Sequence, residues 1–363
     1  MQFATAGYTE NEVKKALVAP DRQIRFRYEL LGRDMKHKRD LKTVSDATIA
    51  FNSKNAIMRT AMFTMREDEI DYLSARIRPV FGLLMRPDTW LEWPLGVFVL
   101  SSPERKATGK SVTWNIEAYD LNQLLKTDGI SERLFFPEGT KYTDIVISTL
   151  IDAGISRTNI EASEEKTRAS VEYPIGTYRL DIINEQLKAI NYTPIYPDAS
   201  GVFTAHKKRD VQLSDIAYNY TTKVNSIIKA EARETLDYFD TPNRFVAFVS
   251  SPELEPLHAV YENDDPSSPL STKNRPVITE VSELRDIANQ NELDAYIRSR
   301  AQEAISDLYG IEFTSGLMPT HGYMDVYQFE HEALKINEIY QETAWTMDLK
   351  AGGNMTHTAR RLV

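Results

Sequence analysis

The sequence predicts a mainly β fold of the α+β class, in which two antiparallel β-barrel or sandwich domains flank a small inserted α/β module. Strand-sized segments of alternating apolar and polar residues recur along the chain, and turn residues bound each of them. Long amphipathic helices do not separate these segments, as a βαβ fold would require. A chain of 363 residues is long enough for two or three domains. We expect the first β domain at residues 1–120, the module at 121–212 and the second β domain at 213–363.

The first domain is predicted to begin with a short helix at residues 9–18. Thr9 is a suitable N-cap, and Glu12 follows three residues later, as in a capping box. From Gln23 to Leu30 apolar and polar residues alternate, which predicts a strand with one solvated face. Four further strands are predicted at residues 47–51, 70–78, 96–101 and 111–119.

The inserted module is predicted from two helix-sized runs and a hairpin. Residues 143–153 end at Gly154, a suitable residue for closing a helix, and residues 177–190 place apolar side chains at spacings of three and four. The hairpin joins strands at 192–196 and 202–205 through the turn Asp198-Ala-Ser-Gly201.

The second β domain is predicted to contain one long helix, at residues 292–308, among strands. Two strands are expected at 224–232 and 244–250, and the proline-rich stretch at 252–273 reads as a long irregular loop. Gly352 and Gly353 predict a hairpin turn between a strand at 344–349 and a last strand.

The residue types that catalysis or metal binding needs are sparse. The sequence has no cysteine, which excludes disulfides, thiolate zinc sites and a cysteine nucleophile. No G-x-S-x-G or G-x-x-x-x-G-K-[ST] motif occurs. No two histidines stand four residues apart, so we expect scattered structural or surface histidines and neither a metal nor a cofactor. The histidines are His37, His206, His258, His321, His331 and His357.

Two groups of residues keep other functions open. Glu67-Asp68-Glu69 and Asp264-Asp265 could supply the carboxylates of a glycosidase, but adjacent acids in polar segments favour solvated turns, and we assign no catalytic residue. Trp90 and Trp93 could form a sugar-stacking platform. The alternative that we favour is that Trp93 lies on a buried strand face with Leu91 and Leu95, or in a subunit contact.

Two longer segments resemble a known family. Within residues 89–130, the run PLGVFVL at 94–100 precedes a charged turn and the run VTWNIEAYD at 112–120. Residues 173–207 combine a helix with a hairpin that has an aromatic first strand and an Asp-x-x-Gly turn. Both segments are similar to the hub proteins of bacteriophage tails, baseplates and related contractile injection systems. The loop at 256–269, the helix after it and the closing strands follow in the family's order, so the resemblance extends from about Gln23 to the end.

The resemblance implies a structural protein without enzymatic activity or cofactor. Three copies would form a pseudo-sixfold ring that joins the hexameric tail tube to a threefold spike or fibre. Its neighbours would be the distal tail or tube proteins, the tape-measure protein and the spike or fibre protein. The location implied is the tail tip or baseplate of the virion, after assembly in the cytoplasm of the host bacterium. Longer relatives carry a C-terminal extension for receptor binding or peptidoglycan digestion; because this sequence ends at Val363, we expect a separate partner to supply those activities.

Composition agrees with these expectations. The formal net charge is −10, which disfavours gripping DNA and is compatible with letting it pass. No apolar run approaches the ~20 residues that span a bilayer, and the start of the chain does not resemble an export signal. As subunit contacts we predict Trp90, Trp93, Phe135 and Phe136. The alternatives are a tail-tip cell-wall hydrolase and a carbohydrate-binding module.

Overall fold

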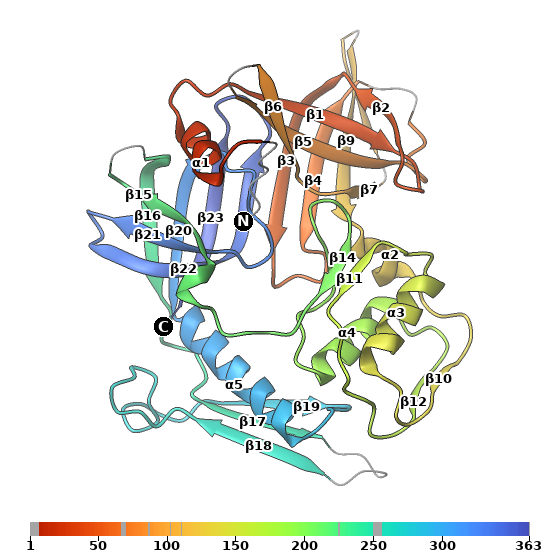
Figure 1. Cartoon of the computed structure of the whole chain (residues 1–363), viewed down its shortest axis with the longest axis vertical. Helices are drawn as coiled ribbons and strands as arrows, with labels where there is room; N and C mark the ends of the chain where they lie inside the picture. The colour runs from red at the N-terminus through yellow and green to blue at the C-terminus, as the bar shows by residue number, and fades with distance from the viewer. Residues whose placement is uncertain are drawn as a thin grey trace.

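The computed structural model describes residues 7–66, 70–85, 88–101, 103–109, 111–223, 226–249 and 256–362. The chain forms four regions (Figure 1). They are an N-terminal β unit, an α/β module, a helix-and-sheet unit that we call the α5 unit, and a C-terminal β unit. Most of the secondary structure is strand, and the helices lie between groups of strands. This confirms the predicted, mainly β fold of the α+β class. None of the helices in these described ranges is long and apolar enough to cross a membrane.

The N-terminal β unit begins with helix α1 (Glu10–Val18), and its predicted capping box is confirmed. The Glu12 N–H donates to Thr9 Oγ1 at 3.3 Å, and the Thr9 N–H donates to Glu12 Oε2 at 2.7 Å. The sheet order β3-β4-β9-β7-β5-β1-β2 is antiparallel throughout. The strands of the unit are β1 (Ile24–Leu31), β2 (His37–Leu41), β3 (Val44–Asn52), β4 (Arg59–Met65), β5 (Arg76–Met85), β6 (Thr89–Pro94), β7 (Phe98–Leu100), β8 (Glu104–Thr108) and β9 (Ser111–Asp120).

The strand predicted at residues 70–78 is wrong in its first half. The Asp71 carboxylate accepts hydrogen bonds from the Leu73 N–H and from the Ser74 hydroxyl. A side chain that binds the backbone two residues later favours a turn over an extended strand. The strand β5 therefore starts only at Arg76.

The α/β module contains both predicted helices, α3 (Tyr142–Asp152) and α4 (Arg179–Ala189). Gly154 ends α3 with a φ of +76°, a conformation that glycine adopts without steric cost. The predicted hairpin is present: β13 (Tyr196–Pro197) pairs antiparallel with β14 (Phe203–Ala205), and an isolated bridge joins Tyr192 to Lys207. The remaining elements are α2 (Asn122–Thr127), β10 (Leu134–Phe136), β11 (Thr158–Ile160) and β12 (Val171–Tyr173).

The C-terminal β unit has the order β16-β20-β23-β22-β21-β15, and only the β15–β21 pairing is parallel. The predicted turn at Gly352 joins β22 to β23, with a φ of +73°. Val224 and Asn225, in the strand predicted at 224–232, lie outside the described residues. The strands are β15 (Ile216–Thr221), β16 (Ile228–Leu236), β20 (Tyr309–Gly316), β21 (Val326–His331), β22 (Ile336–Asp348) and β23 (Asn354–Arg361).

The α5 unit was not foreseen as a separate body. Helix α5 (Gln290–Asp307) matches the predicted long helix and covers a sheet of order β18-β17-β19 with its own apolar core. The loop predicted at 252–273 is wrong in part: its residues 252–255 lie outside the described ranges, but β18 (Leu257–Glu262) is a strand. It pairs antiparallel with β17 (Arg244–Val249), while β19 (Thr279–Leu284) pairs parallel to β17 on its other side.

The two β units are joined by a continuous sheet. Strand β22 pairs antiparallel with β3, from Ala344 opposite Asn52 to Asp348 opposite Thr48. The Trp345 ring stacks on Phe51 with centroids 5.8 Å apart, and one apolar core extends across the seam. Backbone pairing and a shared core fix the two units against each other. The limits at residues 120 and 212 stay a prediction.

Candidate functional site

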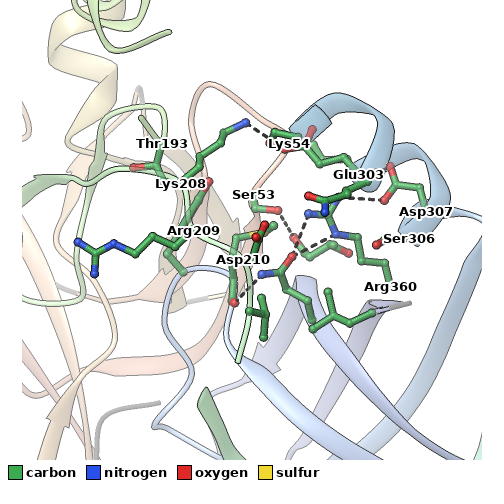
Figure 2. A pocket seen from close by; sticks show the side chains of 18 of the residues that line it. Ser53, Lys54, Thr193, Lys208, Arg209, Asp210, Glu303, Ser306, Asp307 and Arg360 are labelled. Atoms are coloured by element: carbon green, nitrogen blue, oxygen red, sulfur yellow. Dashed lines mark hydrogen bonds and ion pairs between the residues drawn. The ribbon is translucent and has the colours of Figure 1, made fainter. Parts of the chain in front are cut away.

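The four regions meet around a cavity of about 760 Å³. Figure 2 shows side chains from all of them pointing toward this space. Its lining includes Lys54 from the N-terminal β unit, Lys208 from the α/β module, Glu303 and Asp307 from α5, and Arg360 from β23.

Opposite charges face each other across the cavity. Lys208 Nζ lies 3.0 Å from Glu303 Oε1, and Lys54 Nζ lies 2.8 Å from Asp307 Oδ2. Burial by itself would raise the pKa of the Glu303 carboxyl, but the ion pair with Lys208 and the nearby cations outweigh burial and lower it. A general acid needs a raised pKa, so the paired Glu303 carboxylate is suited to holding the α5 unit against the α/β module.

A second junction, between the N-terminal β unit and the α/β module, is dry. The Arg59 side chain is buried and donates from Nη1 to the Pro197 carbonyl at 2.7 Å, while the Arg59 backbone N–H donates to Asp120 Oδ2 at 2.7 Å. Asn122 Nδ2 donates to the carbonyls of Ala56 and Ile195 at 3.0 and 2.9 Å. Burial raises the pKa of the Asp120 carboxyl to about 6, against the opposing effect of the backbone N–H groups of Arg59 and Asn122 that donate to it and of the Arg59 charge.

The four predicted contact residues differ in accessibility. Trp93 is 4% exposed and its ring packs edge-on against Phe81 at 6.1 Å, so this indole belongs to the protein's own core and offers no contact surface. Trp90 is half-buried beneath the Arg25 guanidinium, 4.1 Å from the ring centroid. Phe136 packs partly against the core of the α/β module, whereas Phe135 is 61% exposed.

The structure also locates the residues that were considered for sugar binding and for glycosidase activity. With Trp93 buried, the Trp90–Trp93 sugar platform lacks its second ring; Leu91 and Leu95 are buried too, as on the strand face that we favoured. Asp265 accepts hydrogen bonds from the Ser267 N–H and hydroxyl, which lower its pKa, as in a solvated turn. Asp264 pairs with Lys273. Glu67, Asp68 and Glu69 lie outside the described residues.

The structure brings together two histidines that lie 36 positions apart in the sequence and that no sequence motif connects. His321, in the segment between β20 and β21, and His357, on β23, face the Glu342 carboxylate of β22 in the core of the C-terminal β unit. Burial lowers the pKa of His321 well below its ordinary value and raises the pKa of Glu342. One signal was available, because His357 alternates with the buried Met355 and Ala359 and thus occupies an inward position. The other histidines stand apart from this group.

Comparison with known proteins relates the chain to tail proteins through structure alone. No family model matches the sequence, and neither does any curated protein. A tail protein from Neisseria meningitidis superposes with a TM-score of 0.67 at 11% identity, covering 93% of this chain and 96% of that one. The 43 kDa tail protein of prophage MuSo2 from Shewanella oneidensis gives 0.64 at 10% identity, over 93% and 98%. A chain of the Francisella PdpA–VgrG complex gives 0.56 at 10% identity, over 97% of this chain and 61% of that one.

These likenesses extend over nearly the whole of this chain, across all four regions described above. Both tail proteins are also covered almost completely. At such low identity the shared property is the arrangement of strands and helices. The chain therefore has the phage tail-protein fold, and the family resemblance noted in its sequence is confirmed at the level of the fold.

Proposed function

We propose that this protein is a structural hub of a phage tail tip or baseplate. In this proposal three copies form a pseudo-sixfold ring that joins the hexameric tail tube to a threefold spike or fibre. The observation that carries the proposal is the likeness to two tail proteins, one of them from a prophage, over more than nine-tenths of each chain. The implied location is the virion tail, and the implied neighbours are the tube, tape-measure and spike or fibre proteins.

The junction of the two β units supports this arrangement. Each chain presents two β units side by side, linked through the β3–β22 ladder and one shared core. Three chains would thus present six β units around a threefold axis, as a hexameric tube above them requires. Because backbone hydrogen bonds cross the seam, the angle between the two units would stay fixed under load.

The charge of the chain supports a passive channel. Binding to DNA gains most of its affinity from cations that neutralise phosphates. The chain carries 53 acidic against 43 basic side chains, and the basic residues of the central cavity are already paired with carboxylates. DNA would therefore pass through the ring without specific binding.

A structural role without catalysis is the second part of the proposal. Glu303 and Asp307 are the acids that line the central cavity from α5, and both are held in ion pairs with Lys or Arg. Hydrolysis of a glycosidic bond needs one protonated carboxyl group beside one ionised one. A peptidoglycan zymogram of the purified protein should accordingly show no clearing band.

Negative-stain electron microscopy of the purified protein tests the ring directly. We expect class averages of a threefold or pseudo-sixfold ring with an open lumen, with the protein alone or after it is mixed with its tail-tube protein. Particles that remain monomeric under both conditions would contradict the ring, and clearing in the zymogram would contradict the non-enzymatic role.

The contribution of Phe135 to the proposed ring can be tested by substitution. Replacing this exposed ring by serine should weaken subunit association, because buried aromatic side chains dominate protein interfaces. Sedimentation velocity of Phe135→Ser measures the effect. Leu73→Ser is the matched control, since Leu73 is a highly exposed apolar residue of the N-terminal β unit. If both variants associated as strongly as the wild type, Phe135 would not be an interface residue.

A further inference from the structure

We propose that His321, Glu342 and His357 form a structural site for one divalent transition-metal ion, with zinc as the best match. The site lies in the core of the C-terminal β unit, where all three side chains are buried. Its residues come from three segments: the stretch between β20 and β21, strand β22 and strand β23.

The spacing of the donor atoms suits a tetrahedral ion. His357 Nδ1 lies 3.2 Å from Glu342 Oε2, and His321 Nδ1 lies 3.6 Å from the same oxygen. One donor atom from each of the three residues lies within 4.8 Å of the others. Zinc binds nitrogen and oxygen at ~2.0–2.2 Å, which places neighbouring tetrahedral ligands roughly 3.3–3.5 Å apart. Both nitrogen–oxygen distances are thus close to the required separation.

The other nitrogen of each ring is held in the way that metal-binding histidines usually are. His321 Nε2 lies 2.7 Å from the Tyr220 hydroxyl, and His357 Nε2 lies 2.8 Å from Ser315 Oγ. A partner on the distal nitrogen fixes the ring and leaves Nδ1 available as the donor. Both Nδ1 atoms consequently face the carboxylate.

Without an ion, the hydrogen-bonding capacity of His321 is not fully satisfied. His321 Nδ1 is buried and has no hydrogen-bond partner among the described residues. The side chains of Glu342 and His357 are 0% exposed, and that of His321 is 1% exposed. An unpaired polar atom or a carboxylate buried in an apolar core is costly. A bound cation would satisfy the free nitrogen of His321, and it would take the place of the hydrogen bond between His357 Nδ1 and the Glu342 carboxylate.

The backbone and the charge balance favour the same assignment. A β-bulge between Glu342 and Ala344 interrupts the pairing of β22 with β23, and bulges commonly redirect a side chain next to a functional site. Two neutral imidazoles and one carboxylate would leave a dication with one excess positive charge. Asp325 Oδ2, 4.0 Å from His321 Nδ1, is close enough to balance it.

A second cluster of ligand-type residues provides a contrast. Glu29, His37 and Asp40 also lie close together, on β1 and β2. There, however, Arg27 pairs with both carboxylates and Arg78 with Glu29, and His37 is exposed. Guanidinium groups already neutralise these acids and would repel a cation. The cluster therefore serves as a matched control.

Metal content and folding test the proposal on the whole chain. Protein purified without metal-chelating resin is stripped with EDTA, then unfolded and refolded with or without Zn²⁺, because a buried site fills during folding. We expect one Zn²⁺ per chain by elemental analysis and a higher thermal midpoint with Zn²⁺. Refolding with Co²⁺ should give the visible absorption bands of a tetrahedral ion. Refolded protein that holds no stoichiometric metal and melts identically in both conditions would overturn the site.

Variants at three positions test which residues bind the ion, so the test does not depend on a single variant that fails to fold. His357→Gln should abolish stoichiometric binding, and Ser315→Ala, which keeps every ligand, should weaken it by roughly 10- to 100-fold. His37→Ala should bind like the wild type. Loss of binding in His37→Ala, or full affinity in Ser315→Ala and His357→Gln together, would place the ion elsewhere and overturn the assignment.

Discussion

The α/β module is held on two sides by contrasting joints. Toward the N-terminal β unit, Arg59, Asp120 and Asn122 form a dry polar joint in which the three side chains are 1–2% exposed. Toward α5, the ion pair between Lys208 and Glu303 lies beside the central cavity, with both side chains partly exposed. One joint is desolvated and the other is reached by water.

This difference determines how each joint responds to change. Breaking a buried charge pair by removing one partner costs about 3–5 kcal/mol, because the remaining charge stays desolvated. An exposed ion pair contributes only about 0–1 kcal/mol, and salt screens it. The dry joint should therefore fix the module to the β scaffold. The wet joint should affect only how tightly the α5 unit packs against the module.

The largest expected effect comes from removing the cation of the dry joint. Arg59→Ala should lower the free energy of unfolding by about 3–5 kcal/mol at pH 7.5, because Asp120 would lose its nearby positive charge and the Pro197 carbonyl its donor. Urea denaturation followed by tryptophan fluorescence measures this. Lys54→Ala is the control, since it removes a cation whose pair with Asp307 is exposed. Similar small losses in both variants would show that the two joints do not differ.

The sequence predicts the strands and helices of this molecule better than it predicts the joints. Alternation and capping signals located β1, β3, β9, α1, α3, α4 and α5 because those signals are local. Arg59 carries no local sign of burial, since its acceptor at Pro197 is 138 positions away. His321, Glu342 and His357 likewise meet only through the packing of two strands and the segment between β20 and β21. Strand β18 was missed because the surrounding prolines favoured a loop.

A smaller effect should appear as a pH dependence of the dry joint. Burial raises the pKa of Asp120 from 3.8 to about 6, so between these values the folded chain holds a proton that the unfolded chain has lost. The stability from this group is complete below pH 3.8 and is lost as the pH rises through 6. Asp120→Asn cannot titrate. The wild type should therefore lose on the order of 2–3 kcal/mol relative to this variant between pH 4 and 7.

Chemical denaturation of both proteins across this pH range gives the difference directly. Asp120→Asn is expected to be less stable at every pH, because the backbone N–H groups of Arg59 and Asn122 donate to different oxygens of Asp120, and an amide offers an NH2 group in place of one of them. The quantity to measure is therefore how the difference in the free energy of unfolding between the two proteins changes with pH. A difference that stays constant with pH would mean that Asp120 titrates in the folded protein as it does in the unfolded one.

The smallest effect is expected at the wet joint, where the response to salt is more telling than the change in stability. Lys208→Ala should alter the free energy of unfolding by less than about 1 kcal/mol, because both partners are partly solvated. Hydrogen exchange in α5 should nevertheless become faster in this variant, and in the wild type when the salt concentration is raised to about 1 M, where the Debye length falls to ~3 Å. Exchange around Arg59 should not change, since that joint is shielded from ions. Lys223→Ala removes an exposed pair with Glu330 inside one β unit and should leave α5 unchanged. If high salt accelerated hydrogen exchange equally at both joints, the proposed difference between a rigid joint and a salt-sensitive joint would be wrong.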